Sequence, residues 1–283
     1  MNLDNNTNRK CCPVCQSLKV KNLGCLDYGS DVRFGSIHIV LQREPELCEC
    51  KSCDSWFVNN ILSEEQAVSL YAEGESDQRW DAGAFSEAKL PEVLETLSQI
   101  IEPGANIIDI GCNTGELLDF CASKSAVTCG VELSSSSRSV CQTKGHTVFE
   151  SVAAVTGSFD VVFAFDLVEH LYDLPSFLGS SLEMLKEGGV LVILTGDNSS
   201  IVARRYQRDW WYLRYPEHIL FPSSKSWRNQ PGFRKFRKIT TYASRGYRSK
   251  PASRLKALIN FIRKKGNGLP LLSSDHHLVI LQK

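Results

Sequence analysis

Asn106-Ile-Ile-Asp-Ile-Gly-Cys-Asn-Thr-Gly-Glu-Leu-Leu118 is the stretch that decides the fold, because it predicts a short buried strand, a glycine turn and the start of a helix. Residues 107–110 are β-branched and apolar apart from the carboxylate of Asp109. Such a run is typical of a strand that is covered on both faces in a parallel sheet. Gly111 and Gly115 have no Cβ, so the backbone can turn sharply there and let a ligand approach the N–H groups that begin the next helix.

An acidic residue stands about 20 residues beyond the glycine turn, at the position expected for ribose recognition. Residues 126–131 predict a second apolar strand, and Glu132 follows it directly. A carboxylate at the end of that strand can accept hydrogen bonds from both hydroxyls of a ribose. The two strands and the turn together predict a nucleoside-binding βαβ unit.

Strands and helices alternate regularly over the following part of the chain. Residues 147–149, 159–165 and 190–194 are predicted strands, and a helix is expected over residues 175–185. Regular alternation with short connections predicts a doubly wound α/β sheet. Residues 275–281 predict a last strand, which is expected to return antiparallel beside the strand at 190–194.

Composition and charge narrow the class of protein. The chain has 283 residues, is 42% apolar and has a formal net charge of zero. Its overall charge therefore gives no electrostatic attraction to nucleic acid or to an anionic membrane. Residues 1–10 lack the apolar region of a signal peptide, and no apolar run approaches the roughly 18 residues of a transmembrane helix. We therefore expect a cytoplasmic protein. The 11 cysteines, an odd number, indicate reduced thiols and metal ligands more than a disulfide framework.

Two C-x-x-C knuckles lie near the N-terminus, separated by a spacer in which residues 32–41 are rich in β-formers. Two facing knuckles supply four thiolates in a tetrahedral array, the arrangement of a structural zinc ribbon without an open position for a substrate. Cys11 and Cys48 stand beside the knuckles, but the two-residue spacing favours the inner set. The predicted zinc ligands are Cys12, Cys15, Cys50 and Cys53.

These patterns divide the chain into two predicted domains, a zinc-ribbon module over residues 1–62 and the α/β domain over residues 63–283. Residues 63–101 are expected to be a helical connector, whose first helix begins with a capping box, Ser63-Glu-Glu-Gln66. Residues 199–228 are expected to form a substrate lid. Three aromatic residues of the connector either reach over the nucleoside site or pack on the core, and we favour packing: Tyr71, Trp80 and Phe85.

Four segments in order carry a more specific signal: residues 109–115 (Asp-Ile-Gly-Cys-Asn-Thr-Gly), 130–132 (Gly-Val-Glu), 159–170 (ending in Val-Glu-His) and 185–193. Together they resemble the successive motifs of class I S-adenosylmethionine-dependent methyltransferases. A nicotinamide dehydrogenase fits less well, because the two glycines are spaced G-x-x-x-G and lack the three-glycine fingerprint. The resemblance implies a Rossmann-like, seven-stranded methyltransferase sheet.

The resemblance also implies roles for single residues. Asp109 and the turn at 111–115 would hold the methionine end of S-adenosylmethionine, Glu132 its ribose and Leu133 its adenine. The family's usual acidic contact to adenine has no clear counterpart here, so no residue is assigned to it. The residues predicted to bind the cofactor are Asp109, Gly111, Cys112, Asn113, Gly115, Glu132, Leu133 and Asp166.

A finer resemblance joins the two cysteine knuckles, the segment Trp56-Phe-Val58 after them, and Tyr215-Pro-Glu-His218. This combination is similar to a bacterial subfamily that includes sugar C-methyltransferases and methyltransferases of glycan biosynthesis, and its C-methyltransferases carry Tyr-x-Glu-His after the fifth strand. The resemblance implies methyl transfer to a sugar, a nucleotide sugar or a glycan intermediate.

A sugar hydroxyl, or a carbon beside a ketone, arrives protonated and needs a base. Imidazole, with a pKa of about 6.5, is the usual group that takes such a proton at neutral pH. His218, backed by Glu217 and Tyr215, is the first candidate, because the segment after the fifth strand lies at the edge of the sheet where ligands bind.

His170 is the second candidate, because it ends a D-x-x-E-H pattern that also contains Asp166 and Glu169. The spacing is similar to the E-x-x-E-H metal site of ubiquinone-type O-methyltransferases, and oxygen ligands with one imidazole suit magnesium. The alternative function is therefore a small-molecule O-methyltransferase with a phenolic or quinone-type acceptor. A second alternative is an RNA methyltransferase, but residues 165–170 lack the Asn/Asp-Pro-Pro-aromatic motif of base-amine methylators, so nucleic acid is not an expected partner.

Two basic segments are relevant to what the protein binds, a substrate in one case and a membrane surface in the other. Residues 204–214 interleave arginines with Trp and Tyr, which suits a nucleotide sugar or a phosphate-linked glycan, while a lid packed on the core is the alternative. Residues 251–265 predict a basic amphipathic helix, which either lies on an anionic membrane or turns its apolar stripe to its own core. We favour the second interpretation of this helix, and the oligomeric state is not predicted.

Overall fold

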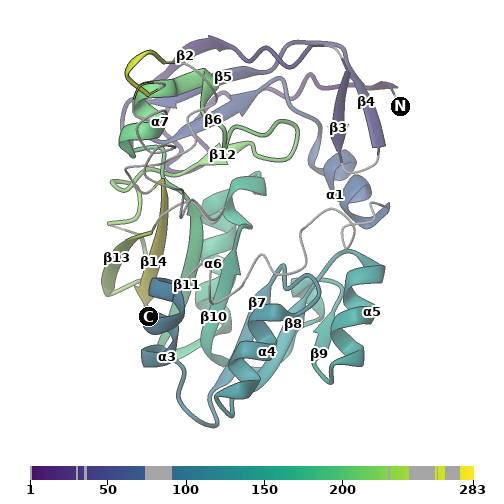
Figure 1. Ribbon diagram of the computed structural model, residues 1–283, viewed down its shortest axis with the longest axis vertical. Helices are drawn as coiled ribbons and strands as arrows, with labels where there is room; N and C mark the ends of the chain where they lie inside the picture. Colours follow the sequence, from purple (N-terminus) through teal and green to yellow (C-terminus); the bar gives the residue numbers. More distant parts are fainter. Residues whose placement is uncertain are drawn as a thin grey trace.

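A sheet of seven strands forms the centre of the described part of the chain in the computed structural model (Figure 1). The structure describes residues 2–29, 31–34, 37–73, 91–228, 230–241, 259, 261–264 and 275–283. The strand order is β13-β14-β11-β10-β7-β8-β9. The strands are β7 (Asn106–Ile110), β8 (Val127–Val131), β9 (Thr147–Phe149), β10 (Phe159–Phe165), β11 (Leu185–Gly196), β13 (Lys235–Thr241) and β14 (His276–Gln282).

The directions of the strands match the sequence prediction. Neighbouring strands from β9 to β11 are parallel, whereas β14 runs antiparallel to β11, with Ile193 opposite Val279. The doubly wound seven-stranded sheet is therefore confirmed, and so is the antiparallel return of the last strand. One boundary differs, because β11 begins at Leu185, five residues before the start of the predicted strand at 190–194.

Both faces of the central sheet are covered, as its nearly continuous apolar strands require. Ile107 packs with Val93 and Leu117, whereas its neighbour Ile108 packs with Leu178 on the opposite face. The helices that supply these contacts are α3 (Pro91–Ile100) and α4 (Glu116–Ser123) on one face and α6 (Leu174–Met184) on the other.

Helix starts follow the capping residues of the sequence. The hydroxyl of Ser63 accepts the N–H of Gln66 at 3.2 Å, and the Gln66 side chain accepts the N–H of Ser63 at 2.8 Å, so the predicted capping box is formed. Ser134 caps the helix that begins at Ser135, where its side chain accepts the N–H of Ser137. The remaining helices are α1 (Glu64–Glu73), α5 (Ser135–Thr143), α7 (Ile201–Tyr206) and the 3₁₀ turns η1 (Val152–Ala154), η2 (Val168–His170) and η3 (Gln207–Asp209).

Two small sheets of the N-terminal region lie above the central sheet in Figure 1. The four-stranded sheet has the order β12-β6-β5-β2, and its edge strand β12 comes from residues that directly follow His218 and Ile219. Leu220 pairs with Phe57, so the segment after His218 is fixed to the N-terminal region. The strands are β1 (Asn2–Leu3), β2 (Val20–Cys25), β3 (Asp31–Phe34), β4 (Ile37–Leu41), β5 (Glu46–Cys50), β6 (Trp56–Asn59) and β12 (Leu220–Phe221).

Some sequence predictions fall outside the described residues. These are Trp80 and Phe85 of the connector and most of the basic helix at 251–265, of which the structure describes 259 and 261–264. Among the described helices, none is both long and apolar enough to cross a membrane.

Candidate active site

The glycine turn after β7 is tight and closes against β8. Gly111 and Gly115 have φ angles of 83° and 85°, and Asn113 between them has a φ of 46°. A Cβ on Gly115 would lie 2.6 Å from Sγ of Cys141, so a larger residue meets both backbone strain and a clash. The turn therefore brings backbone N–H groups to the start of α4, at the carboxyl end of the sheet.

Two carboxylates flank this turn. Asp109 lies one residue before the end of β7 with only 4% of its surface exposed, and its Oδ1 accepts no hydrogen bond from any described group. Burial, and then the charge of Glu132, raise the pKa of Asp109 to about 7. Glu132 accepts the N–H of Asn113 at 2.9 Å and that of Ser134 at 2.8 Å, and burial raises its pKa too.

The donor set suits S-adenosylmethionine. The buried Oδ1 of Asn113, like that of Asp109, accepts no hydrogen bond from the described groups, so two acceptors at the turn can receive the N–H groups of an ammonium. Leu133 is 41% exposed beside Glu132 and offers an apolar face for adenine.

The other predicted cofactor residues lie in different surroundings. Cys112 is buried, and its thiol interacts with Cys141, which raises the pKa of Cys112. Asp166 follows β10 with a φ of 48°, and burial, followed by the charge of Glu169, raises its pKa to about 6. Cys112 therefore supports the turn, whereas Asp166 stands between the cofactor turn and the histidines described next.

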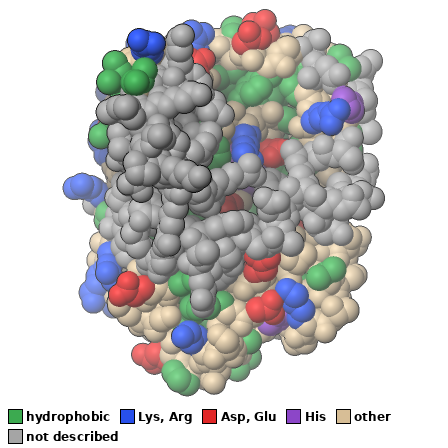
Figure 2. Space-filling model, viewed as in Figure 1, with side chains coloured by type: hydrophobic (Ala, Val, Ile, Leu, Met, Phe, Trp, Pro, Cys, Tyr) green, Lys and Arg blue, Asp and Glu red, His purple; other side chains and the backbone are tan. Residues whose placement is uncertain are grey.

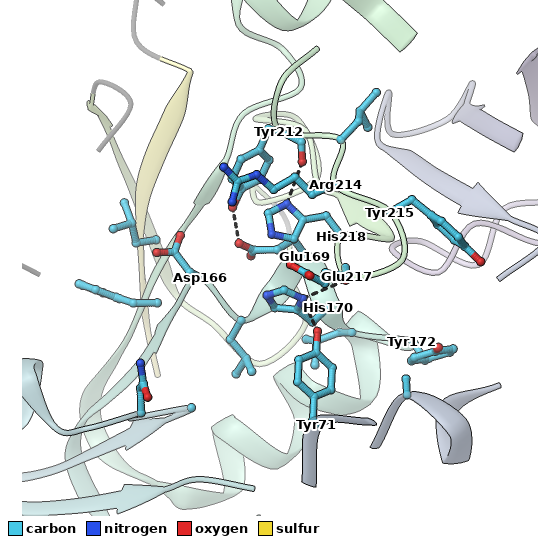
Figure 3. Close-up of a pocket in the computed structure, with 18 of the residues that line it drawn as sticks. Tyr71, Asp166, Glu169, His170, Tyr172, Tyr212, Arg214, Tyr215, Glu217 and His218 are labelled. Atoms are coloured by element: carbon cyan, nitrogen blue, oxygen red, sulfur yellow. Dashed lines mark hydrogen bonds between the residues drawn. The ribbon is translucent and has the colours of Figure 1, made fainter. Parts of the chain in front are cut away.

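Two histidines from distant segments meet at the opposite end of the site (Figure 3). The ring centres of His170 and His218 are 4.9 Å apart. Nδ1 of His218 lies 2.8 Å from the carbonyl oxygen of Tyr212, and Nδ1 of His170 lies 2.9 Å from that of Glu217. Burial, and then the neighbouring His170, hold the pKa of His218 well below its usual value, so the ring of His218 is neutral at pH 7.

Glu169 lies beside the two histidines and is fully buried. Its carboxylate accepts hydrogen bonds from the hydroxyl of Tyr212 and, at 2.9 Å, from that of Thr195. Burial raises the pKa of Glu169 in spite of these two donors. Neither contact could be predicted from the sequence, because Thr195 and Tyr212 lie 26 and 43 positions away from Glu169 in the chain.

Two residues contact the histidine pair and a third does not. Tyr71, for which the sequence favours a packing role, places its hydroxyl 2.8 Å from Nδ1 of His170 and thus belongs to the site. Glu217 is buried and contributes its carbonyl to the same nitrogen. Tyr215, by contrast, donates its hydroxyl to Asn60 at 3.1 Å, and Figure 3 shows its side chain directed away from the histidine pair.

A third histidine of the site was missed from the sequence. His276 lies at the start of β14 and lines the same cavity, with Nδ1 2.9 Å from the carboxylate of Asp275. Burial alone lowers the pKa of His276, but Asp275, Asp166 and Glu169 together raise it above its usual value. The available signal was the antiparallel return of this strand, which puts its first residues at the carboxyl ends of its parallel neighbours.

One cavity of about 1480 Å³ connects the glycine turn to the histidines. A single small-ligand pocket typically measures about 300–1,000 Å³, so there is room for a cofactor and an acceptor. In the space-filling view a hollow lies near the middle of the drawn face, with basic and acidic side chains visible in it (Figure 2). Trp211, Tyr212 and Arg214 line the acceptor half of this cavity.

The four cysteines of the two knuckles converge. Their sulfurs all lie within 4.8 Å of one another, with Cys12 to Cys53 at 3.7 Å and Cys15 to Cys50 at 3.5 Å. Sulfurs about 2.3 Å from a tetrahedral zinc lie roughly 3.8 Å apart, so the cluster is consistent with a zinc ribbon. Cys11 and Cys48 are not part of the cluster.

Curated relatives match only part of the chain. A ubiquinone biosynthesis O-methyltransferase of Bradyrhizobium sp. (strain ORS 278) is 30% identical over 38% of this chain and 48% of its own length. The enzyme of the same name from Methylobacterium nodulans is 28% identical over 44% of this chain and 53% of its own length. The chain thus spans about half the length of these relatives.

Solved structures show the same fold. A SAM-dependent methyltransferase of Thermotoga maritima superposes with a TM-score of 0.51 at 16% identity, covering 74% of this chain and 95% of that one. Magnesium protoporphyrin IX methyltransferase of Synechocystis PCC 6803 gives a TM-score of 0.51 at 12% identity, covering 80% and 99%. The family described as "Methyltransferase domain" matches residues 82–231, more than half of the chain. The chain therefore belongs to this methyltransferase domain family and is a SAM-dependent methyltransferase.

Proposed function

We propose that the enzyme transfers a methyl group to a sugar, a nucleotide sugar or a glycan intermediate. The observation that carries this proposal is the composition of the acceptor half of the cavity. The guanidinium of Arg214 lies 5.4 Å from the ring centre of Trp211, and both residues line the cavity with Tyr212. Aromatic faces stack on sugar or base rings, and a guanidinium pairs with phosphate, so these three side chains suit a phosphorylated sugar.

Other residues of the same segment support the core instead. Arg204 pairs with Glu49 at 2.8 Å and covers the ring of Trp56, and Tyr206 is buried. The segment at 204–214 therefore combines both interpretations of the sequence: its first part packs, and its last part lines the cavity.

When bound, the cofactor supplies a methyl carbon that leaves its sulfur as the bond to the acceptor forms, and the sulfur keeps the electron pair of the broken bond. The residues of this chain have to hold the acceptor in line and receive its proton. Nδ1 of His218 donates to a carbonyl, so Nε2 of the neutral ring carries the lone pair that receives a proton. We propose His218 as this base, with His170 next to it.

The test is a product assay with an acceptor panel. Purified enzyme and S-adenosylmethionine are incubated with nucleotide-linked keto-deoxysugars, catechols and a small structured RNA, and methylated products are identified by mass spectrometry. We expect methylation of a sugar and loss of at least about 100-fold in rate for His218→Ala. Methylation of catechols alone, or of RNA alone, would overturn the sugar proposal.

A second candidate function is methylation of an oxygen on a phenolic or quinone-type acceptor. It is favoured by the curated relatives, which are named ubiquinone biosynthesis O-methyltransferases. The catechol arm of the panel tests it directly.

We also propose that the four-cysteine cluster binds a structural zinc ion. The N–H groups of Val14 and Ser52 each lie 3.4 Å from a cysteine sulfur, which stabilises thiolates in the two knuckles. Metal analysis of the purified protein should find zinc that is retained until the thiols are blocked.

A further inference from the structure

Three side chains at the acceptor end of the cavity converge on one point. Glu169, His170 and His218 each offer a ligand atom, and these three atoms lie within 4.8 Å of one another. All three residues line the cavity. Two of them come from η2, and the third comes from the segment before β12, so the fold brings together groups that are 48 residues apart in the sequence.

The hydrogen bonds around the two rings fix which nitrogens carry protons. A carbonyl oxygen only accepts, so Nδ1 of His218, at 2.8 Å from Tyr212 O, must be a donor. Nδ1 of His170 lies 2.9 Å from Glu217 O and 2.8 Å from the hydroxyl of Tyr71, so with Nδ1 protonated both oxygens accept from its N–H. In neutral rings each Nε2 then carries a lone pair. In metal sites, a backbone carbonyl that accepts the other ring N–H commonly fixes the orientation of a histidine ligand in this way.

The carboxylate is held in the same manner. The hydroxyls of Tyr212 and Thr195 donate to the two oxygens of Glu169, and each oxygen keeps a further lone pair. Two imidazoles and one carboxylate therefore gather electron pairs in a buried place. A cation at their centre compensates the cost of burying these acceptors together.

We propose that Glu169, His170 and His218 bind a divalent transition metal ion. Two nitrogens and one oxygen suit zinc, manganese or iron(II), whereas magnesium and calcium prefer oxygen ligands. Three protein ligands leave positions open, and the cavity gives an acceptor access to them. Asp166, which the sequence pattern groups with Glu169 and His170, is not one of the three.

This inference deepens the proposed function at the acceptor site and rests on it only for the role of the metal. With a metal bound, His218 is a ligand and no longer the base. The metal then lowers the pKa of a bound acceptor hydroxyl, as such ions do for bound water, so that the proton of this hydroxyl passes to solvent water in the cavity. The binding site itself does not depend on which acceptor is used.

Metal stoichiometry tests the proposal without an acceptor. The full chain is saturated with Co²⁺, excess metal is removed, and the cobalt per chain is measured together with the absorption spectrum. We expect two ions, one with the thiolate charge-transfer bands of the cysteine cluster and one without them. His170→Ala and His218→Ala should each lose the ion without thiolate bands, and Glu169→Gln should bind it at least about 10-fold more weakly.

His276→Asn is the matched control, because it removes a buried imidazole from the same cavity but not from the triad, and it should keep both ions. If the unaltered protein binds only one cobalt ion and its spectrum shows only thiolate bands, the metal proposal is overturned. This outcome does not depend on whether the variants fold. The acceptor panel, run on the same sample, separates this outcome from a failure of the proposed function, because it measures methyl transfer and not metal binding.

Discussion

The carboxylate of Glu132 accepts the backbone N–H of Asn113 at 2.9 Å, so the end of β8 is joined to the glycine turn that follows β7. The other oxygen accepts the N–H of Ser134 at 2.8 Å. One side chain thus fixes both walls of the place where a ribose is expected. Glu132 lines the cavity, and its remaining lone pairs can accept hydrogen bonds from the ribose hydroxyls.

Glu132→Ala should therefore weaken S-adenosylmethionine binding by at least about 100-fold, since hydrogen bonds to a charged group contribute roughly 1.5–3 kcal/mol each. Isothermal titration calorimetry measures the change. Glu150→Ala is the control, because the side chain of Glu150 is 77% exposed nearby and should be replaceable without effect. Equal affinity of Glu132→Ala and the unaltered enzyme would remove Glu132 from the site.

The raised pKa of Asp109 predicts a pH-dependent cost to stability. Its folded-state pKa of about 7 lies above the usual 3.8, so between these values the folded protein holds this proton more tightly than the unfolded chain does. The free energy of unfolding must then fall as the pH rises through this window. Asp109→Asn should stabilise the cofactor-free protein at pH 8, by on the order of 2 kcal/mol, and by less at pH 5.

Thermal unfolding at the two pH values checks this prediction. Asp160→Asn is a suitable comparison, because Lys186 holds the pKa of Asp160 below its usual value and its substitution should give no gain at pH 8. A stabilisation by Asp109→Asn that is larger at pH 5 than at pH 8 would contradict the argument.

The sequence could predict those parts of the fold and site that depend on local patterns. The glycine turn, the strand runs and the four-cysteine cluster each lie in short segments with a fixed spacing, and the sheet order follows from the motifs. The pairing of β12 with β6 could not be predicted in this way, because a two-residue strand carries no periodicity.

The acceptor end depended on contacts across the chain. His170 and His218 were separate candidates in the sequence, with either one as base, and only the fold shows that their rings touch. Tyr71 was interpreted as packing, since an aromatic residue in an amphipathic helix usually is. Its hydroxyl reaches a histidine 99 positions away, which no local pattern encodes.

The cysteine cluster should stabilise the fold next to the histidine pair. Cys12 and Phe57 share one apolar cluster with Leu220, which follows His218 closely in the chain. If the cluster binds zinc as proposed, Cys12→Ser should abolish this binding and lower the melting temperature by on the order of 10 °C, because structural zinc contributes directly to folding. Cys11→Ser, at the neighbouring cysteine outside the cluster, should change neither the metal content nor the melting temperature. Metal analysis and differential scanning calorimetry of the two variants measure these quantities.

Gly130 and Cys112 give a test of the packing beneath the cofactor turn. A Cβ on Gly130 would lie 2.5 Å from Sγ of Cys112, closer than two such atoms can approach, so Gly130→Ala should destabilise the protein by about 1–3 kcal/mol. Adding Cys112→Ala removes the sulfur and should restore much of the loss. Chemical denaturation of the single and double variants measures the coupling between the two sites.

Gly179→Ala supplies the opposite result for the same change of residue. A Cβ there meets nothing within 4 Å, and Gly179 lies inside α6, where alanine is favoured over glycine by about 0.5–1 kcal/mol. A gain at Gly179 with a loss at Gly130 would assign the loss to the crowding around Gly130, and recovery in the double variant would assign it to the contact with Cys112. Additive effects of Gly130→Ala and Cys112→Ala, without recovery in the double variant, would instead mean that the new methyl group is not in conflict with the sulfur of Cys112.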